Sequence, residues 1–222
     1  MIFTDRRQAG ILLAERLKAV SDRTSLLIGL PRGGVVVAAA ISEKLALPLD
    51  VVVVKKIPSP MQSELGVGAL APDGVSFVDW KLSHRVAADE EYINAKVRDL
   101  SGEIRQRTLL YRRGRKPLAV KGKNIIVVDD GAATGATLEA AIKWLRKKGA
   151  RRIIAAVPVA SLDVAVKVTP EVDQFISLEI PPEFDAVGQF YKVFPQISDA
   201  EVVQLLQESE NQERNLLDEA IK

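Results

Sequence analysis

The sequence contains no cysteine, and this absence excludes several kinds of chemistry. Disulfides, thiolate nucleophiles and sulfur-ligated metal sites cannot form, and a chain without cysteine fits a reducing compartment. Long hydrophobic runs are also missing, because apolar stretches such as VVVV and IIAAVPVA are too short to span a bilayer. The N-terminus, MIFTDRRQAG, is charged from its start, so no signal peptide is expected. We therefore predict a cytoplasmic protein without a membrane partner.

An excess of charge of one sign is absent as well. The 222 residues carry 31 Lys and Arg against 29 Asp and Glu, a formal net charge of +2. Without a strong basic field, nucleic acid is not expected as a partner. The composition, 47% hydrophobic and 27% charged, is that of an ordinary globular chain with one large core and room for a small appendage.

Short apolar runs alternate with helical patterns along the chain. Strands are expected at residues 25–30, 51–56 and 124–129, among others, with helices between them. This alternation predicts an α/β fold with a mostly parallel central sheet flanked by helices. The run VVVVKK, residues 51–56, is apolar on both faces and is expected to be a central strand.

Other segments interrupt this pattern. Residues 57–74 hold three prolines and several glycines, so part of this segment is expected to be loop, in which LGVGAL and VSFV could pair as short strands. Residues 82–113 show helical spacing and form one long helix or two. A C-terminal helix is expected at 198–207, followed by a polar tail at 208–222 that frays or forms an arm. We expect one domain over residues 1–207.

The stretch IIVVDDGAATGAT, residues 125–137, carries the strongest chemical signal. A buried strand runs into Asp129 and Asp130, and seven small residues follow before a helix. Such a loop exposes main-chain N–H groups that, with the helix dipole, attract an anion, typically phosphate, and Thr134 and Thr137 add hydroxyl donors. The two acids suit a ligand that also presents hydroxyls or a magnesium ion. A ribose 5-phosphate meets both requirements.

Other readings of this stretch fit less well. It has neither the lysine of a Walker A loop nor the G-x-G-x-x-G of a dinucleotide-binding turn. An acidic strand end followed by an ordinary helix-capping turn is the structural alternative. The LPRGG turn, residues 30–34, is a second candidate for anion binding, because Arg32 offers a fork of donors and two glycines admit close approach. A capping turn with a solvated Arg32 explains it equally well.

The motif at 125–137 resembles the PRPP (phosphoribosyl pyrophosphate) binding motif of the type I phosphoribosyltransferases. Further segments look like a stand-alone subgroup of that family, over nearly the whole chain up to about residue 207. These are FTDRRQAGILLAERL, IGLPRGGVVVAAAIS, VVVVKKIPSPMQSELGVGAL, PVASLDVAVKV and PPEFDAVGQFYKVFPQISDAEVV. The resemblance implies the type I fold with a small hood and a lid at about 55–74. It also implies transfer of ribose 5-phosphate from PRPP to a nucleobase-like acceptor, with Mg²⁺ as cofactor.

A regulatory protein that binds PRPP or a nucleotide without turnover is the first alternative. A hydrolase or phosphorylase that acts on the same ribose phosphate is a weaker one. The partners implied are small molecules, namely PRPP and a base or nucleotide. A homodimer is also considered.

The resemblance implies roles for particular residues. Asp129, Asp130 and Arg32 are the expected catalytic residues: the carboxylates hold the ribose hydroxyls, and Arg32 stabilises the leaving pyrophosphate. The metal is expected to meet ribose and pyrophosphate oxygens, with only indirect contact to Asp129 and Asp130. A strained or cis non-proline peptide is predicted between Pro31 and Gly33. The expected PRPP-binding set is Asp129, Asp130, Gly131, Ala132, Ala133, Thr134, Gly135, Ala136 and Thr137, and the pyrophosphate set is Pro31, Arg32, Gly33, Gly34 and Lys56.

The acceptor is the least defined part of the expectation. Glu64 lies where the family has its lid, and contact with magnesium, ribose or acceptor and an ordinary loop charge all stay open. Phe184 and Tyr191 sit in a proline-bounded loop, where core packing is the first interpretation and stacking on the acceptor the second. Enzymes of the hypoxanthine-guanine type carry an aspartate at the position of Ala133, so the resemblance gives no support to a 6-oxopurine acceptor. Adenine-type and other members also have alanine there, so their acceptors stay open.

Overall fold

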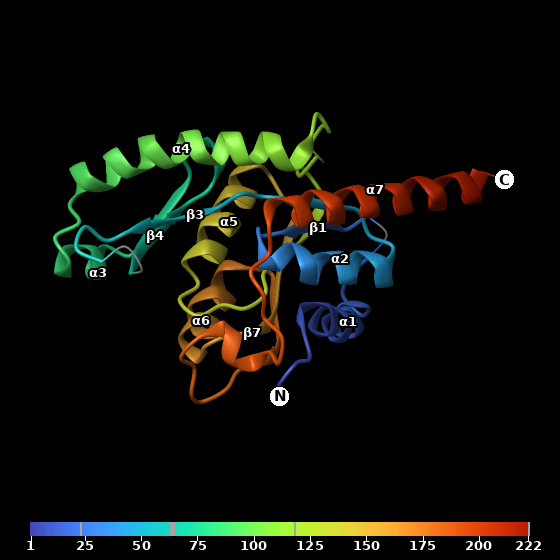
Figure 1. The fold of residues 1–222 in the computed structure, drawn as a ribbon, viewed down its shortest axis with the longest axis horizontal. Coiled ribbons are helices and arrows are strands. Elements are labelled where there is room, and N and C mark those ends of the chain that lie inside the picture. The colour runs from blue at the N-terminus through green and yellow to red at the C-terminus, as the bar shows by residue number, and fades with distance from the viewer. Residues whose placement is uncertain (23, 63–64, 118, 222) are drawn as a thin grey trace.

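A computed structural model describes residues 1–22, 24–62, 65–117 and 119–221 of the chain. Its central sheet has five parallel strands in the order β2-β1-β6-β7-β8, which confirms the predicted α/β fold (Figure 1). The strands are β1 (Leu26–Gly29), β2 (Leu49–Val51), β6 (Asn124–Val128), β7 (Arg152–Val159) and β8 (Gln174–Glu179).

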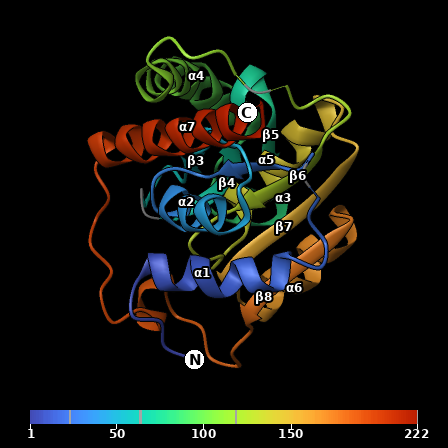
Figure 2. The same ribbon diagram turned by 90° about the vertical axis from the view of Figure 1, so that its right-hand side faces the viewer.

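Helices cover both faces of this sheet. On one face lie α1 (Arg6–Leu17), α2 (Gly33–Leu45) and α7 (Asp199–Ile221), which are stacked in Figure 2. On the other lie α5 (Ala136–Lys147) and α6 (Leu162–Val168). Alternate residues of one strand enter different cores, because Leu27 packs with the α1 and α2 side chains whereas Ile28 packs with those of α5. Burial on both faces explains why these strands read as uninterrupted apolar runs.

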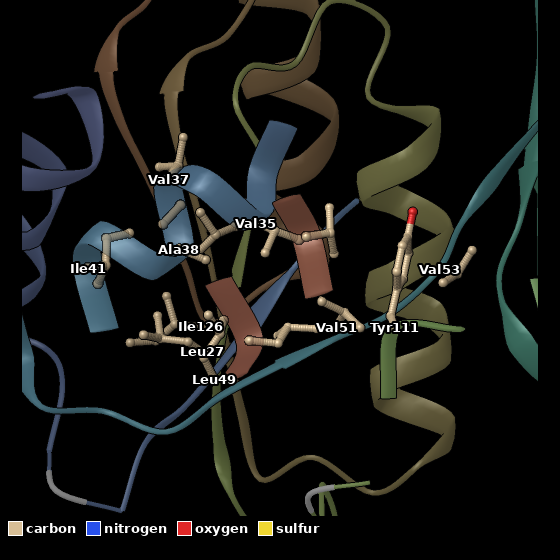
Figure 3. Close-up of a cluster of buried hydrophobic side chains, with 14 of the residues drawn as sticks. Leu27, Val35, Val37, Ala38, Ile41, Leu49, Val51, Val53, Tyr111 and Ile126 are labelled. Atoms are coloured by element: carbon tan, nitrogen blue, oxygen red, sulfur yellow. The ribbon is translucent and has the colours of Figure 1, made fainter. Parts of the chain in front are cut away.

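The larger core joins the main sheet to helix α2 and to residues of the long helix that follows the second sheet. Leu27, Leu49, Val51 and Ile126 of the sheet pack with Val35, Val37, Ala38 and Ile41 of α2 (Figure 3). Tyr111, which is 1% exposed, extends this cluster toward the long helix α4 (Glu90–Arg112). Ile57, Val67 and Leu70 belong to the same cluster, so these residues and the main sheet share one continuous core.

The hood is a second, antiparallel sheet in the order β3-β4-β5. Its strands are β3 (Lys55–Pro58), β4 (Gly66–Leu70) and β5 (Ser76–Val78), with the short 3-10 turn η1 (Pro72–Gly74) between the last two. The predicted pairing of LGVGAL with VSFV is confirmed by the β4–β5 ladder. Helix α3 (Trp80–Arg85) and α4 follow as two helices, and α4 lies along the top of the molecule in Figure 1.

The prediction of a central strand at residues 51–56 is wrong. The valine run leaves the main sheet at its edge, where β2 ends at Val51, and enters the hood as β3 at Lys55. Val52 and Val54 pack into one core and Val53 into the other, and these three residues belong to neither strand. Because burial is uniform along the run, the apolar pattern could not locate the change of sheet.

The C-terminal helix is longer than predicted. Helix α7 continues to Ile221 and extends past the rest of the molecule, instead of ending at residue 207 (Figure 1). The added turns contain neither glycine nor proline, and Glu210 pairs with Arg214 at 2.7 Å one turn later. Two further 3-10 turns, η2 (Thr169–Glu171) and η3 (Val187–Phe190), complete the described elements. No helix within the described ranges is long and apolar enough to cross a bilayer.

Candidate active site at the ends of β1 and β6

Asp129 and Asp130 follow β6 and touch the turn that follows β1. These strands are parallel neighbours, so their carboxyl ends meet. A Cβ atom on Gly34 would lie 2.7 Å from the Cα of Asp129 and 2.8 Å from the carbonyl oxygen of Val128. A Cβ atom on Gly33 would overlap Oδ2 of Asp130. The two glycines therefore allow the LPRGG turn to lie directly against the start of the DDGAATGAT loop.

The two carboxylates have different partners. Asp130 forms an ion pair with Arg6, with 2.7 Å between Oδ2 and Nε, and the side chains are only 16% and 8% exposed. Asp129 has no ion pair among the described residues, and its Oδ1 accepts a hydrogen bond from the Asp130 N–H at 2.9 Å. Burial, and next the Asp130 carboxylate, raise the pKa of Asp129 well above its ordinary value. Burial also raises the pKa of Asp130, against the opposing effect of Arg6. Hydroxyl donors on a ligand would stabilise this pair.

The loop after the acidic pair leads directly into α5. Gly135, with φ of 76°, precedes the helix, and no side chain caps it. Ala132 is fixed to the end of β7, because its N–H donates to the Val159 carbonyl and its own carbonyl accepts from Ser161 N–H. Among the described residues, the N–H groups of residues 133–138 have no hydrogen-bond acceptor. The loop thus presents a row of free donors at a helix N-terminus, as anion binding requires.

The turn after β1 contains a cis peptide bond between Pro31 and Arg32, which confirms the prediction for the segment between Pro31 and Gly33. The Arg32 side chain is 39% exposed, and its Nη1 lies 3.9 Å from Oδ1 of Asp199 at the start of α7. Arg107 of α4 approaches the same carboxylate at 3.6 Å. Arg32 therefore lies at the edge of the site, with part of its side chain accessible to a ligand.

The two adjacent lysines of β3 have different surroundings. Lys55 binds Glu103 of α4 at 2.7 Å. Lys56 is exposed, and its charge lowers the pKa of Asp129 against the larger effects of burial and Asp130. Lys56 thus acts electrostatically on Asp129, whereas Glu64 lies outside the described residues.

Tyr191 contacts the acidic pair from the C-terminal side. Its buried ring packs on Phe3 and Phe194, with centroids 5.4 Å and 5.0 Å away, and its hydroxyl donates to the Asp130 carbonyl at 2.6 Å. In this structure Tyr191 therefore supports Asp130 and offers no free ring face. Phe184 is half-buried in the same loop. Stacking of the acceptor on either residue stays a prediction.

The N-terminal segment is bonded to this loop along its main chain. The Phe3 N–H donates to the Phe190 carbonyl at 2.8 Å, and the Phe3 carbonyl accepts from Lys192 N–H at 2.8 Å. The Val193 N–H then donates to the Thr4 carbonyl at 3.0 Å. These bonds fix the loop that carries Tyr191 beside the start of α1.

Tyr191→Phe is expected to lower the free energy of unfolding by about 1 kcal/mol, because a buried hydroxyl–carbonyl hydrogen bond is lost while the ring is kept. Urea denaturation followed by circular dichroism measures the change. Tyr191→Leu, which also removes the ring, should cost clearly more. Equal stability of Tyr191→Phe and the parent chain would show that the hydroxyl contributes nothing.

Sequence reasoning did not single out Arg6, although the structure places it in the site. The signal that could have found it is its position: Arg6 is the first residue of α1, and that helix has no acid in its first turn. A cation is unfavourable at a helix N-terminus. An arginine at this position therefore indicates a partner elsewhere in the fold.

A large cavity among the described residues lies elsewhere. It has a volume of about 710 Å³ and is enclosed by α4, residues 71–74 and the end of α5, with Trp144 in its wall. No residue of the loop 129–137 lines it. Residue 118, which lies between the wall residues Pro117 and Ala119, is outside the described ranges.

The parallel five-stranded sheet with helices on both faces is a fold of the phosphoribosyltransferase type. The chain belongs to the phosphoribosyl transferase domain family, whose model matches residues 7–186. It is 40% identical over 205 residues to "Putative phosphoribosyl transferase Rv0571c" and to its counterpart MT0597, both of Mycobacterium tuberculosis. These matches cover 92% of this chain but 46% of each relative, so the chain spans about half the length of the curated relatives it matches.

Solved structures share the fold. The crystal structure of TT1426 from Thermus thermophilus is 38% identical, with a TM-score of 0.79 and coverage of 94% of this chain and 99% of that one. A hypothetical protein from Neisseria gonorrhoeae, solved with bound ppGpp, is 15% identical with a TM-score of 0.51, covering 93% of this chain and 96% of that one. The second likeness concerns the fold alone.

Proposed function

We propose that the protein transfers ribose 5-phosphate from PRPP to a nucleobase-like acceptor and releases pyrophosphate, with Mg²⁺ as cofactor. The observation that carries the proposal is the juxtaposition of Asp129 and Asp130 with the free N–H groups of residues 133–138, in a chain of this family. A sugar phosphate needs hydrogen-bond acceptors for its hydroxyls at one end and hydrogen-bond donors for its phosphate at the other. The acidic pair supplies the acceptors, and the loop N–H groups supply the donors.

Each part of the site has a role in this proposal. The 5-phosphate binds the loop amides of residues 133–138 and the hydroxyls of Thr134 and Thr137. The ribose hydroxyls donate to Asp129, which lacks an ion pair among the described residues, and to the Asp130 oxygen that Arg6 leaves free. The pyrophosphate lies along the turn of residues 31–34, within reach of Arg32 and Lys56.

The expected chemistry follows from these positions. The bond between C1′ and the pyrophosphate oxygen breaks, pyrophosphate leaves with the electron pair, and a lone pair of the acceptor forms the new bond to C1′. Positive charge develops on the ribose, which the carboxylates stabilise, while Arg32, Lys56 and the turn amides stabilise the leaving anion. Bound Mg²⁺ supplies further neutralisation of the pyrophosphate charge.

The donor set fits a metal held mainly by the substrate. Among the described residues, no group of three or more His, Cys, Asp or Glu side chains is placed to bind an ion. Mg²⁺ commonly keeps several waters and binds substrate phosphates. The ion would therefore bind ribose and pyrophosphate oxygens and water, and Asp129 and Asp130 would reach it indirectly.

A regulatory protein that binds PRPP or a nucleotide without turnover is the second candidate. One observation favours it: Ala133, at the position where hypoxanthine-guanine type enzymes carry an acid–base aspartate, offers no side chain for proton transfer. Its carbonyl is occupied by the Ser161 hydroxyl at 3.0 Å. The acceptor of the transferase would then have to be one that needs no such group.

Pyrophosphate release from PRPP, measured with a panel of purine and pyrimidine bases, tests the proposal. We expect release with at least one base, and loss of release when EDTA removes divalent metal. Binding of PRPP by calorimetry without release for any base would instead support the regulatory candidate. Absence of both binding and release would contradict both.

A further inference from the structure

Arg6 is a buried cation that contacts the acidic pair directly. Its Nε donates to Oδ2 of Asp130 at 2.7 Å, and its Nη1 donates to the Pro195 carbonyl at 2.8 Å. The guanidinium carbon lies 3.7 Å from the centroid of the Phe194 ring. One side chain thus joins the ribose-binding carboxylate to the loop after η3. Arg6, Phe194 and Pro195 all lie outside residues 7–186, which the family model matches.

The position of Arg6 is unfavourable for a cation. Arg6 is 7% exposed and stands at the N-terminus of α1, where the helix dipole opposes positive charge. Burial of a guanidinium is costly unless its donors are satisfied and its charge is paired. Here Asp130, Pro195 and Phe194 meet these needs together. The neighbouring Arg7, by contrast, has a 59% exposed side chain and pairs with Glu43 at the surface.

We propose that Arg6 is a positioning residue for ribose binding: it holds one oxygen of Asp130 and so presents the other, ionised, to the ligand. The inference deepens the proposed function and depends on it. Gly33 supports the arrangement, because a Cβ atom there would lie 2.8 Å from Nε of Arg6 and would overlap Asp130 Oδ2. The ion pair therefore lies against the turn that is expected to bind pyrophosphate, so the two ligand-binding loops and α1 meet at one carboxylate.

The charge state of Asp130 depends on what surrounds it. Arg6 faces it from α1, Asp129 from the end of β6 and the Tyr191 hydroxyl from the C-terminal loop, while Lys56 of β3 acts on Asp129. Burial raises the pKa of Asp130, and Arg6 is the main group that opposes this rise. Removing the guanidinium should therefore move protonation of Asp130 to higher pH and weaken its acceptor function near neutrality.

The test compares PRPP binding by R6Q, R6K and R7Q with that of the parent chain, by calorimetry from pH 5.5 to 9 in the presence of Mg²⁺. We expect R6Q to bind roughly 10-fold to 100-fold more weakly at pH 7, the range for a charge-assisted hydrogen bond. Its acid limb, where binding declines, should lie at higher pH than in the parent. R6K keeps the charge but not the planar fork, so its affinity should lie between the two. R7Q should match the parent.

The pH profile separates positioning from a purely structural role. Loss of folding alone would lower affinity without moving the acid limb, and a melting temperature is recorded for each variant. Should R6Q fail to fold, R6K decides the question, because partial affinity with a shifted limb supports positioning. Folded R6Q or R6K with the affinity and acid limb of the parent would overturn the role of Arg6 while leaving the proposed function intact. A parent chain that binds no PRPP would overturn both.

Discussion

Asp129→Asn weakens PRPP binding by about 10-fold to 100-fold without lowering the melting temperature; this is the expected result for a carboxylate that accepts ribose hydroxyls. Asparagine keeps an oxygen for the Asp130 N–H, which is the hydrogen bond that Oδ1 of Asp129 accepts at 2.9 Å. What it loses is the negative charge and one acceptor. Calorimetric titration with PRPP and Mg²⁺ measures the affinity.

The stability half of this expectation follows from the sign of the pKa shift. The pKa of Asp129 is raised in the folded chain by burial and by Asp130, above the 3.8 expected without those effects. Above that value the unfolded carboxyl is ionised at no cost, while the folded one carries an unfavourable charge. The substitution should therefore stabilise the protein at neutral pH, and the gain should fade as the pH falls to about 4. Thermal melting at pH 7 and pH 4 checks the trend.

Asp130→Asn is the matched contrast. It leaves Arg6 buried without its counter-charge, and breaking such a pair from one side typically costs about 3–5 kcal/mol. Because burial also raises the pKa of Asp130, removing its charge offsets part of this cost. We therefore expect its melting temperature to fall while that of Asp129→Asn stays or rises. If both variants melt together below the parent, Asp129 is a structural acid. If Asp129→Asn binds PRPP as tightly as the parent, its assignment to the ribose hydroxyls is wrong.

Gly34→Ala has the second large expected effect. The new Cβ atom would lie 2.7 Å from the Cα of Asp129 and 2.8 Å from the carbonyl oxygen of Val128, and neither can move without shifting β6. Forced packing of this kind costs about 1–3 kcal/mol. The shift would also displace both carboxylates, so PRPP binding should fall below detection by calorimetry.

Gly102→Ala is the control for this substitution. Gly102 lies in α4, and beyond its chain neighbours and the backbone of its own helix no described atom is within 4 Å of the position of its Cβ. Alanine there should raise the free energy of unfolding by about 0.5–1 kcal/mol, since glycine weakens a helix interior. Urea denaturation measures the free energy of unfolding of the two variants and of the parent chain. A Gly34→Ala protein as stable as the parent, with intact PRPP affinity, would contradict the close approach of Gly34 to the end of β6.

The sequence could predict the parts of the site that are local in the chain. The strand, the acidic pair, the small-residue loop and the helix of residues 124–147 are consecutive, so each step follows from its neighbours. The unusual peptide between Pro31 and Gly33, by contrast, was predicted only from the family resemblance. The family resemblance added the roles of these residues, which the residue types alone left open.

What could not be predicted depends on contacts between distant segments. Arg6 and Asp130 are 124 residues apart, and no periodicity links them. The change of sheet between Val51 and Lys55 depends on which strands lie beside the valine run, and this is invisible when every residue is apolar. Likewise the packing of Tyr191 on Phe3 joins opposite ends of the chain.

The main-chain pairing of residues 3–4 with 190–193 has a consequence for motion. Neither segment can detach without breaking the hydrogen bonds of the other. Tyr191 in the second segment and Arg6, two residues after the first, also bond to Asp130. Their amides should consequently exchange with deuterium as one cooperative unit, although they are separated by most of the sequence. A bound ribose phosphate would slow deuterium exchange at residues 3–4 and at residues 190–193 together, so exchange at either segment reports on binding.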